Sequence, residues 1–171
     1  MRFLAIDLGD RRTGLAVGDT YTGLAGPAGV LEVPRDRDGG LALLRALDDA
    51  IEEHLGPSHM PGGLVLGLPL HMDGSESPRA KLARAFAETL KERTGRTVYL
   101  QDERLTSIEA DERMARTGMT HKQKKRKRDA LAAAAMLTEF LRAQREQAPA
   151  DGWGDGPPTD LGYGPDQGDH V

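Results

Sequence analysis

The chain has 171 residues, with 23 Lys and Arg against 27 Asp and Glu and a formal net charge of −4. This length suits one domain with an adequate core. The sequence contains no cysteine, which excludes disulfides and thiolate-bound zinc. No apolar run approaches the ~20 residues that a membrane helix needs, and the chain starts directly on a strand pattern. We therefore expect a cytoplasmic protein without membrane contact.

The charge is unevenly distributed along the chain. Residues 148–171 hold five Asp and no Lys or Arg, so residues 1–147 hold 23 basic and 22 acidic side chains. The Gly, Pro and Asp content of the last segment predicts a disordered acidic tail behind a single domain over residues 1–147. The domain contains one dense basic run, residues 121–128. A local patch of this kind favours binding to a polyanion.

The first structural signal is a hairpin over residues 3–18, where two apolar runs flank a Gly/Asp/Arg/Thr/Gly break. Asp7 lies inside the first apolar run, where an unpaired carboxylate costs several kcal/mol or shifts its pKa until it is neutral. Two interpretations are open. A bound cation compensates Asp7, or Asp7 is a partly exposed residue at a strand end and pairs with Arg11 or Arg12.

Residues 24–33 form the next strand pattern. Two glycines and a proline interrupt it, so we expect a short strand or an edge strand. Leucines and an isoleucine then recur at helical spacing over residues 41–55, before Gly56 and Pro57. This spacing predicts an amphipathic helix.

Residues 63–70 are almost continuously apolar, which predicts a central strand buried on both faces. A second helix is predicted over residues 78–93, with Leu82, Phe86 and Leu90 on one face and a glycine as its stop.

The last elements start with a strand over residues 97–101. Capping-box spacing at Thr106 and Glu109 predicts a helix over residues 107–117. We expect the basic run to be a loop and residues 129–144 to form a long helix with a small-residue inner face. That face is expected around Ala132, Ala135 and Met136.

The order of these elements predicts a mixed α/β fold. An antiparallel opening hairpin is followed by strands that helical crossovers join, and such strands are parallel. Helices flank the sheet. Ligands of such sheets gather near the carboxyl ends of the central strands.

Three acidic residues stand where this fold can bring them together, namely Asp7, Glu103 at the exit of the last strand and Asp129 at the start of the last helix. Converging carboxylates repel each other unless hard cations neutralise them, and Mg²⁺ or Mn²⁺ fits oxygen ligands. Two such ions can support hydrolysis of a phosphodiester. The simpler alternatives are a salt bridge of Glu103 with Arg104, and an Asp129 that stabilises a helix N-terminus.

Four motifs in this order resemble the YqgF family, also called RuvX. They are AIDLGDRRTGLAV at residues 5–17, GLPLHMDG at 67–74, DERLTS at 102–107 and RDA at 128–130. The resemblance runs from Arg2 to about Arg142.

This resemblance implies a ribonuclease-H-like fold related to the resolvase RuvC. It also implies a metal-dependent endonuclease with Mg²⁺ or Mn²⁺, two ions per site. Such enzymes are assigned to 5′-end processing of precursor 16S rRNA in ribosome biogenesis, or to Holliday junction resolution in DNA recombination and repair. Asp7, Glu103 and Asp129 match the family's catalytic, metal-binding triad.

The chain departs from the family at two places. His71 stands where Asn is usual. Related resolvases carry a further acidic ligand where this chain has Ala132 and Ala133, so three carboxylates hold the metals unless a fourth joins them. The candidates for the fourth ligand are Asp10, Asp73 and Asp102.

The predicted substrate is nucleic acid, gripped through its phosphates by basic side chains near the triad. These side chains are Arg11, Arg12, Arg104, Lys122, Lys124, Lys125, Arg126, Lys127 and Arg128. Junction resolution needs two coordinated cuts and hence a homodimer, whereas a monomer suffices for trimming RNA.

Two other functions fit parts of the sequence. The opening hairpin also resembles the first phosphate loop of sugar kinases and of actin- or Hsp70-like ATPases, which require a second such lobe that this sequence does not show. A nucleic-acid-binding module that kept the fold and lost the chemistry is the other alternative.

Overall fold

The structure, a computed structural model, describes residues 1–103 and 121–147, the first five of the second range by their backbone alone. Arg104, the helix predicted over residues 107–117 and the predicted tail lie outside the described residues, so these remain predictions. No helix of the described residues is long and apolar enough to cross a membrane.

Five strands form one sheet in the order β3-β2-β1-β4-β5. Their bounds are β1 Arg2–Leu8, β2 Thr13–Asp19, β3 Leu24–Leu31, β4 Gly62–Leu68 and β5 Val98–Asp102. The pairs β1/β2 and β2/β3 are antiparallel, whereas β1/β4 and β4/β5 are parallel. The predicted mixed sheet, an antiparallel hairpin followed by parallel strands, is confirmed.

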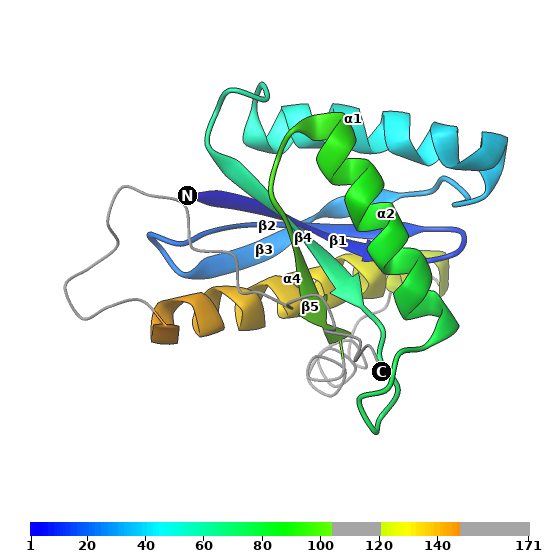
Figure 1. The fold of residues 1–171 in the computed structure, drawn as a ribbon. Helices are drawn as coiled ribbons and strands as arrows, with labels where there is room; N and C mark the ends of the chain where they lie inside the picture. The colour runs from blue at the N-terminus through cyan, green and yellow to red at the C-terminus, as the bar shows by residue number, and fades with distance from the viewer. Residues whose placement is uncertain (104–120, 148–171) are drawn as a thin grey trace, which may run out of the picture.

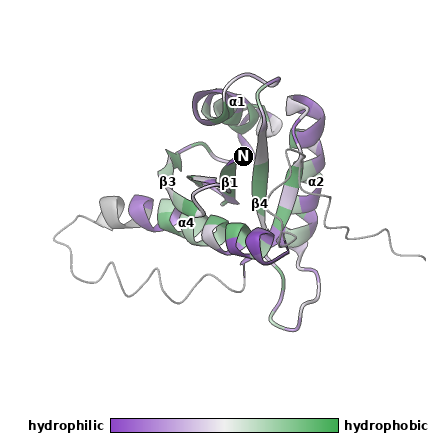
Figure 2. Cartoon of the chain, turned by 90° about the vertical axis from the view of Figure 1, so that its left-hand side faces the viewer, coloured by the Kyte–Doolittle hydropathy of each residue, from purple (hydrophilic) through white to green (hydrophobic). Residues whose placement is uncertain are grey.

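Helices cover both faces of this sheet (Figure 1). After a short 3₁₀ turn at Arg37–Gly40, α1 spans Leu41–Leu55, α2 spans Pro78–Thr94 and α4 spans His121–Gln147. The two views agree that α1 and α4 lie on opposite sides of the sheet (Figure 2). We call these sides the α1/α2 face and the α4 face.

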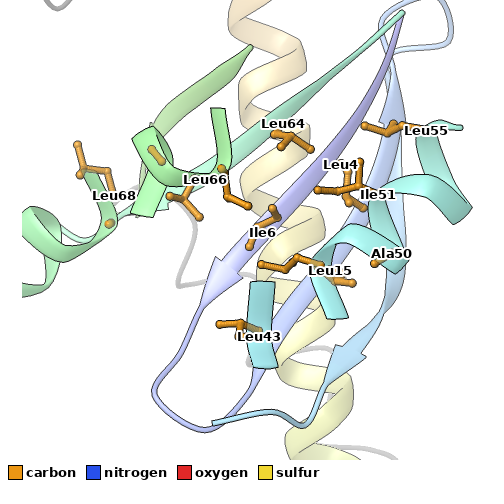
Figure 3. Close-up of a cluster of buried hydrophobic side chains, with 14 of the residues drawn as sticks. Leu4, Ile6, Leu15, Leu43, Ala50, Ile51, Leu55, Leu64, Leu66 and Leu68 are labelled. Atoms are coloured by element: carbon orange, nitrogen blue, oxygen red, sulfur yellow. The ribbon is translucent and has the colours of Figure 1, made fainter. Parts of the chain in front are cut away.

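Side chains of a strand alternate between these two faces. Even-numbered residues of β1 and β4, such as Leu4 and Leu66, pack with α1 and α2 in one buried cluster (Figure 3). Odd-numbered residues, such as Phe3 and Val65, pack with α4 in a second cluster. This alternation decides which face a polar strand residue meets, and it places Asp7 on the α4 face.

The second helix buries a different stripe from the predicted one. Leu82 is 50% exposed, so its predicted place on the inner face is wrong, whereas Leu90 is fully buried. The buried stripe instead consists of Ala80, Ala83, Ala87 and Leu90. Small residues at helical spacing allow α2 to lie close to the sheet, and the larger Leu82 is excluded from that contact.

α4 begins at His121, so the basic run is helical and the predicted loop over residues 121–128 is wrong. Lys, Arg and Gln are good helix formers, and the run contains no Gly or Pro to end a helix. The inner face of α4 is also displaced from the prediction. Of the three residues named for it, Met136 alone is buried, and the alanines in contact with the sheet are Ala130, Ala133 and Ala134.

β3 lies at the edge of the sheet, as its glycines and proline predicted. It is not short, because it runs for eight residues. The pairing with β2 is irregular next to Pro27, where the partner of Leu15 is Gly29 and the partner of Ala16 is Pro27. The irregularity accommodates a residue without a backbone N–H.

Arg96 anchors the segment between α1 and β4, a role that the sequence did not indicate. Its side chain is buried, with 4% exposure. The guanidinium donates hydrogen bonds to four backbone carbonyls, those of Gly56, Pro57, Met60 and Gly62, at 2.8 to 3.2 Å. One side chain therefore provides donors for four backbone carbonyls at the end of α1 and the start of β4.

Replacement of Arg96 by Met is expected to lower the free energy of unfolding by about 2–4 kcal/mol, because four partly buried carbonyls lose their donor. Urea unfolding followed by circular dichroism measures this. Arg93→Met is the matched control, since Arg93 makes an exposed ion pair with Asp48 and its loss is expected to be much smaller. Equal losses in the two variants would contradict the anchoring role.

Candidate active site

Asp7 lies in the central strand β1 and has a glycine on each side of it in the sheet. Its partner in β2 is Gly14. On the other side, Ile6 pairs with Leu66 of β4, so the register places Gly67 beside Asp7. Neither neighbour has a side chain, which leaves space on the α4 face on both sides of the carboxylate.

Glu103 fills the space over Gly67. A Cβ on Gly67 would collide with Oε1 of Glu103, with the carboxyl carbon next in distance. Glu103 follows β5, the strand that pairs with β4 from Leu64 to Leu68. The side chain of Glu103 therefore reaches across β4 toward β1.

Asp129 lies over the other glycine. A Cβ on Gly14 would collide with the backbone carbonyl of Asp129, so α4 contacts the sheet directly at this point. Main-chain contact thus places Asp129 over β2, at the residue that pairs with Asp7. In the sequence, Gly14 and Gly67 were the available signals for these close contacts. They could not be told apart from glycines that a turn requires.

Asp7 interacts electrostatically with each of the other two carboxylates. Burial, and then the charge of Asp129, raise the pKa of Asp7 from 3.8 to about 6. Burial, and then the charge of Asp7, raise the pKa of Glu103 from 4.5 to about 7. Asp102 raises the pKa of Glu103 further, and Arg79 opposes these effects. Asp7 is therefore the middle member of a partly buried group of carboxylates.

Arg12 joins this group as a cation. Its Nε donates a hydrogen bond to Oδ2 of Asp129 at 2.7 Å. The sequence offered Arg12 as a partner of Asp7 or as a phosphate contact, and it offered Asp129 as a helix-end acid. The ion pair between the two was not anticipated, because it joins residues 117 positions apart.

Within the described residues, no three His, Asp or Glu side chains are close enough together to hold one ion. The donor set nevertheless fits a hard divalent cation. It consists of carboxylate oxygens, and burial together with a neighbouring negative charge raises the pKa of two of its members, Asp7 and Glu103. A metal here would be held by Asp7 and Glu103, with Asp129 completing the site.

Asp10 ties three segments together near the same edge of the sheet. It pairs with Arg35 at 3.0 Å and with Arg79, in the first turn of α2, at 2.6 Å. Two arginines thus engage this candidate fourth ligand. Arg79 also influences Glu103 and is the residue that the sequence analysis missed; its position just after the polar exit of β4 was the available signal.

The remaining fourth-ligand candidates are also engaged. Asp73 accepts hydrogen bonds from the backbone N–H and the hydroxyl of Ser75 at 2.9 and 2.6 Å, in an exposed turn. Asp102 adjoins Glu103, and its negative charge contributes to the raised pKa there.

The predicted phosphate-binding residues that the structure describes lie on two elements, the start of α4 and the hairpin turn between β1 and β2. Lys122, Lys124, Lys125, Arg126, Lys127 and Arg128 occupy the first two turns of α4, immediately before Asp129. The last three of these are exposed, and Arg126 pairs with Glu32 at 3.5 Å. Arg11 is exposed in the hairpin turn, whereas Arg12 is half-buried on Asp129. One helix therefore carries both a basic surface and an acid of the site.

Comparison with known families gives a match to the profile of the RuvX family, described as Holliday junction resolvase, over residues 1–143. The chain belongs to the RuvX family. A curated relative from Anaeromyxobacter sp. (strain Fw109-5) is 41% identical over 82% of this chain and 96% of its own length. One from Thiobacillus denitrificans is 38% identical over 82% and 91%. Both are named "Putative pre-16S rRNA nuclease".

Among solved structures, the Fowlpox virus resolvase in complex with Holliday junction DNA superposes with a TM-score of 0.51. The two chains are 11% identical, over 84% of this chain and 98% of the viral one. At this identity the likeness concerns the fold alone. The RuvX member described here has the ribonuclease-H-like fold, as its motifs implied.

Replacing Asp7 by Asn is expected to stabilise the metal-free RuvX chain in a pH-dependent way. The folded-state pKa near 6 exceeds the unfolded value near 3.8, so the folded wild type binds the extra proton between these values and loses stability as pH rises. Asn avoids this loss. The gain should be absent at pH 4 and reach about 2–3 kcal/mol at pH 8.

Urea titrations with a chelator present, at several pH values between 4 and 8, measure this difference. Stability curves of Asp7→Asn and wild type that stay parallel across this range would show that Asp7 carries no buried charge.

Proposed function

We propose that this RuvX chain is a Mg²⁺- or Mn²⁺-dependent endonuclease that hydrolyses phosphodiesters of structured nucleic acid. The observation that supports this proposal is the surroundings of Asp7, where the Glu103 side chain lies over Gly67, the Asp129 main chain lies over Gly14, and both acids influence Asp7 electrostatically. The proposed task is 5′-end maturation of precursor 16S rRNA, the substrate named for the curated relatives, or Holliday junction resolution, the activity named for the family.

The three carboxylates come from β1, from the end of β5 and from α4. Asp7 and Glu103 would hold the metal ions, and Asp129 would complete the site. Bound divalent ions supply charge neutralisation for the attacked phosphate and an activated water. The rigidity of the central strand fixes Asp7, and the packing of α4 on Gly14 fixes the backbone of Asp129. The acids are therefore positioned before substrate arrives.

The basic residues of α4 are proposed to bind the nucleic-acid backbone beside this site. Arg126, Lys127 and Arg128 are exposed within one turn of Asp129. Contacts of this kind read no bases, so recognition depends on the shape of the substrate and weakens with salt. By analogy with related nucleases, cleavage leaves 5′-phosphate and 3′-hydroxyl ends.

Wild-type protein is expected to cut end-labelled precursor 16S rRNA or a labelled four-way DNA junction with Mg²⁺ or Mn²⁺, and not with EDTA. Asp7→Asn should reduce cutting to background, because the middle carboxylate is lost. Asp48→Asn is the matched control, since Asp48 pairs with Arg93 on a remote surface, and it should cut like wild type.

The products separate the possible outcomes. Paired symmetric cuts in the junction assign resolvase activity, and a cut at the mature 5′ end of the RNA assigns processing. Equal cutting by wild type and Asp7→Asn would reveal a contaminating nuclease and remove the proposal. Tight binding of the RNA or the junction without any cutting would favour the non-catalytic module.

Gly67→Ala is expected to displace the carboxylate of Glu103, because the new Cβ overlaps its Oε1. The overlap involves the far end of a flexible side chain, so the variant should fold. It should lose most of the rise in Tm that millimolar Mn²⁺ gives to wild type, because metal binding stabilises the folded state.

Gly26→Ala in β3 is the control for this experiment, since a Cβ there meets nothing within 4 Å. It should keep the full Mn²⁺ response. A normal response in Gly67→Ala would mean that Glu103 does not hold the metal from the place it occupies here.

A further inference from the structure

The ion pair between Arg12 and Asp129 lies inside the proposed metal site and is built into the fold. The side chains are 21% and 26% exposed, and Nε lies 2.7 Å from Oδ2. The backbone of Arg12 is fixed as well, because Gly9 donates its N–H to the carbonyl of Arg12 at 3.0 Å. A Cβ on Gly9 would collide with that carbonyl, so the turn requires glycine there.

The backbone positions of both residues are thus fixed. Arg12 is fixed by the hairpin turn, and Asp129 is fixed by the contact of α4 with Gly14. The pair is also less exposed than others, such as that of Arg84 with Glu76, where each side chain is 35% exposed. Because the two backbones are fixed, the side chains have fewer positions to choose from than those of exposed pairs on mobile segments.

A guanidinium and a divalent cation on one carboxylate repel each other, since both are positive and the carboxylate screens them poorly at half-buried depth. In the arrangement seen here, the Arg12 guanidinium neutralises one of the three acids, Asp129.

We propose that Arg12 is an internal counter-ion of the site, which occupies Asp129 until a divalent cation displaces it. The inference rests on the proposed metal site and adds a competition to it: arginine and metal bind the same acid, so each weakens the other. Once displaced, the guanidinium is free to donate hydrogen bonds to a substrate phosphate beside the carboxylates.

Mn²⁺ binding to the full chain, followed by the electron paramagnetic resonance signal of free Mn²⁺, tests the competition without substrate. Arg12→Gln should tighten binding roughly three- to tenfold, the range for loss of one charged hydrogen-bonded competitor. Arg11→Gln removes the same charge from the neighbouring exposed residue and should change binding less than twofold. Asp7→Asn should weaken binding strongly.

The outcomes distinguish the two proposals. If wild type binds Mn²⁺ through Asp7 but Arg12→Gln binds no more tightly than Arg11→Gln, the counter-ion role is wrong and the metal site stands. Weaker binding in Arg12→Gln would make Arg12 a residue that positions Asp129 for the metal, which also overturns the competition. Absence of Mn²⁺ binding, or binding indifferent to Asp7→Asn, overturns both.

A second measurement uses wild type alone and does not depend on the folding of a variant. In ¹⁵N-labelled protein, the Nε–H resonance of Arg12 should move on addition of Mg²⁺ and saturate together with metal binding. Arg93 supplies the internal reference, because its Nε donates to Asp48 at 2.8 and 3.0 Å on another surface. If the Nε–H chemical shift of Arg12 changes no more than that of Arg93 at saturating Mg²⁺, the metal does not displace Arg12 and the proposal is wrong.

Discussion

The partial burial of the Asp7 carboxylate in the central strand is the constraint on which the site depends. A carboxylate at that depth is unfavourable unless positive charge is near, and the nearest acids add to the problem. The sheet has room for Glu103 and Asp129 because the residues beside Asp7 on both neighbouring strands are glycines. The fold thus concentrates negative charge at a place where apolar side chains would have avoided the cost of burying it.

The α4 helix connects this constraint to the rest of the molecule. Its alanines allow it to lie against the sheet, and Gly18 gives room to Leu137 and Leu141 further along. Phe3, Tyr99 and Phe140 close the same layer with ring centroids 5.1 to 5.9 Å apart. This packing sets the height of α4 over β1, and hence the distance at which Asp129 and the basic turns before it meet Asp7.

The α1/α2 face lies on the side of the sheet opposite the site, and its core holds β1 in place. Leu4 and Ile6 are fully buried there, directly before Asp7 in the chain. On the same edge, Asp10 joins the hairpin turn to Arg35 and Arg79, so the turn that presents Arg12 is braced by α2. The hairpin turn that carries Arg12 is therefore joined to α2 by an ion pair as well as by the sheet.

The sequence by itself determined the strands, the helices at 41–55 and near 78–93 and the mixed sheet, because alternation, helical spacing and turn residues are local signals. Local signals failed where charge and propensity disagree, as in the basic run that proved helical. They also failed where residue size decides packing, as at Leu82. The tertiary structure alone decided that Gly14 and Gly67 make room for Asp129 and Glu103, and that Arg12 binds Asp129. Those contacts join segments far apart in the chain, and their distances are set by how closely α4 and the sheet pack.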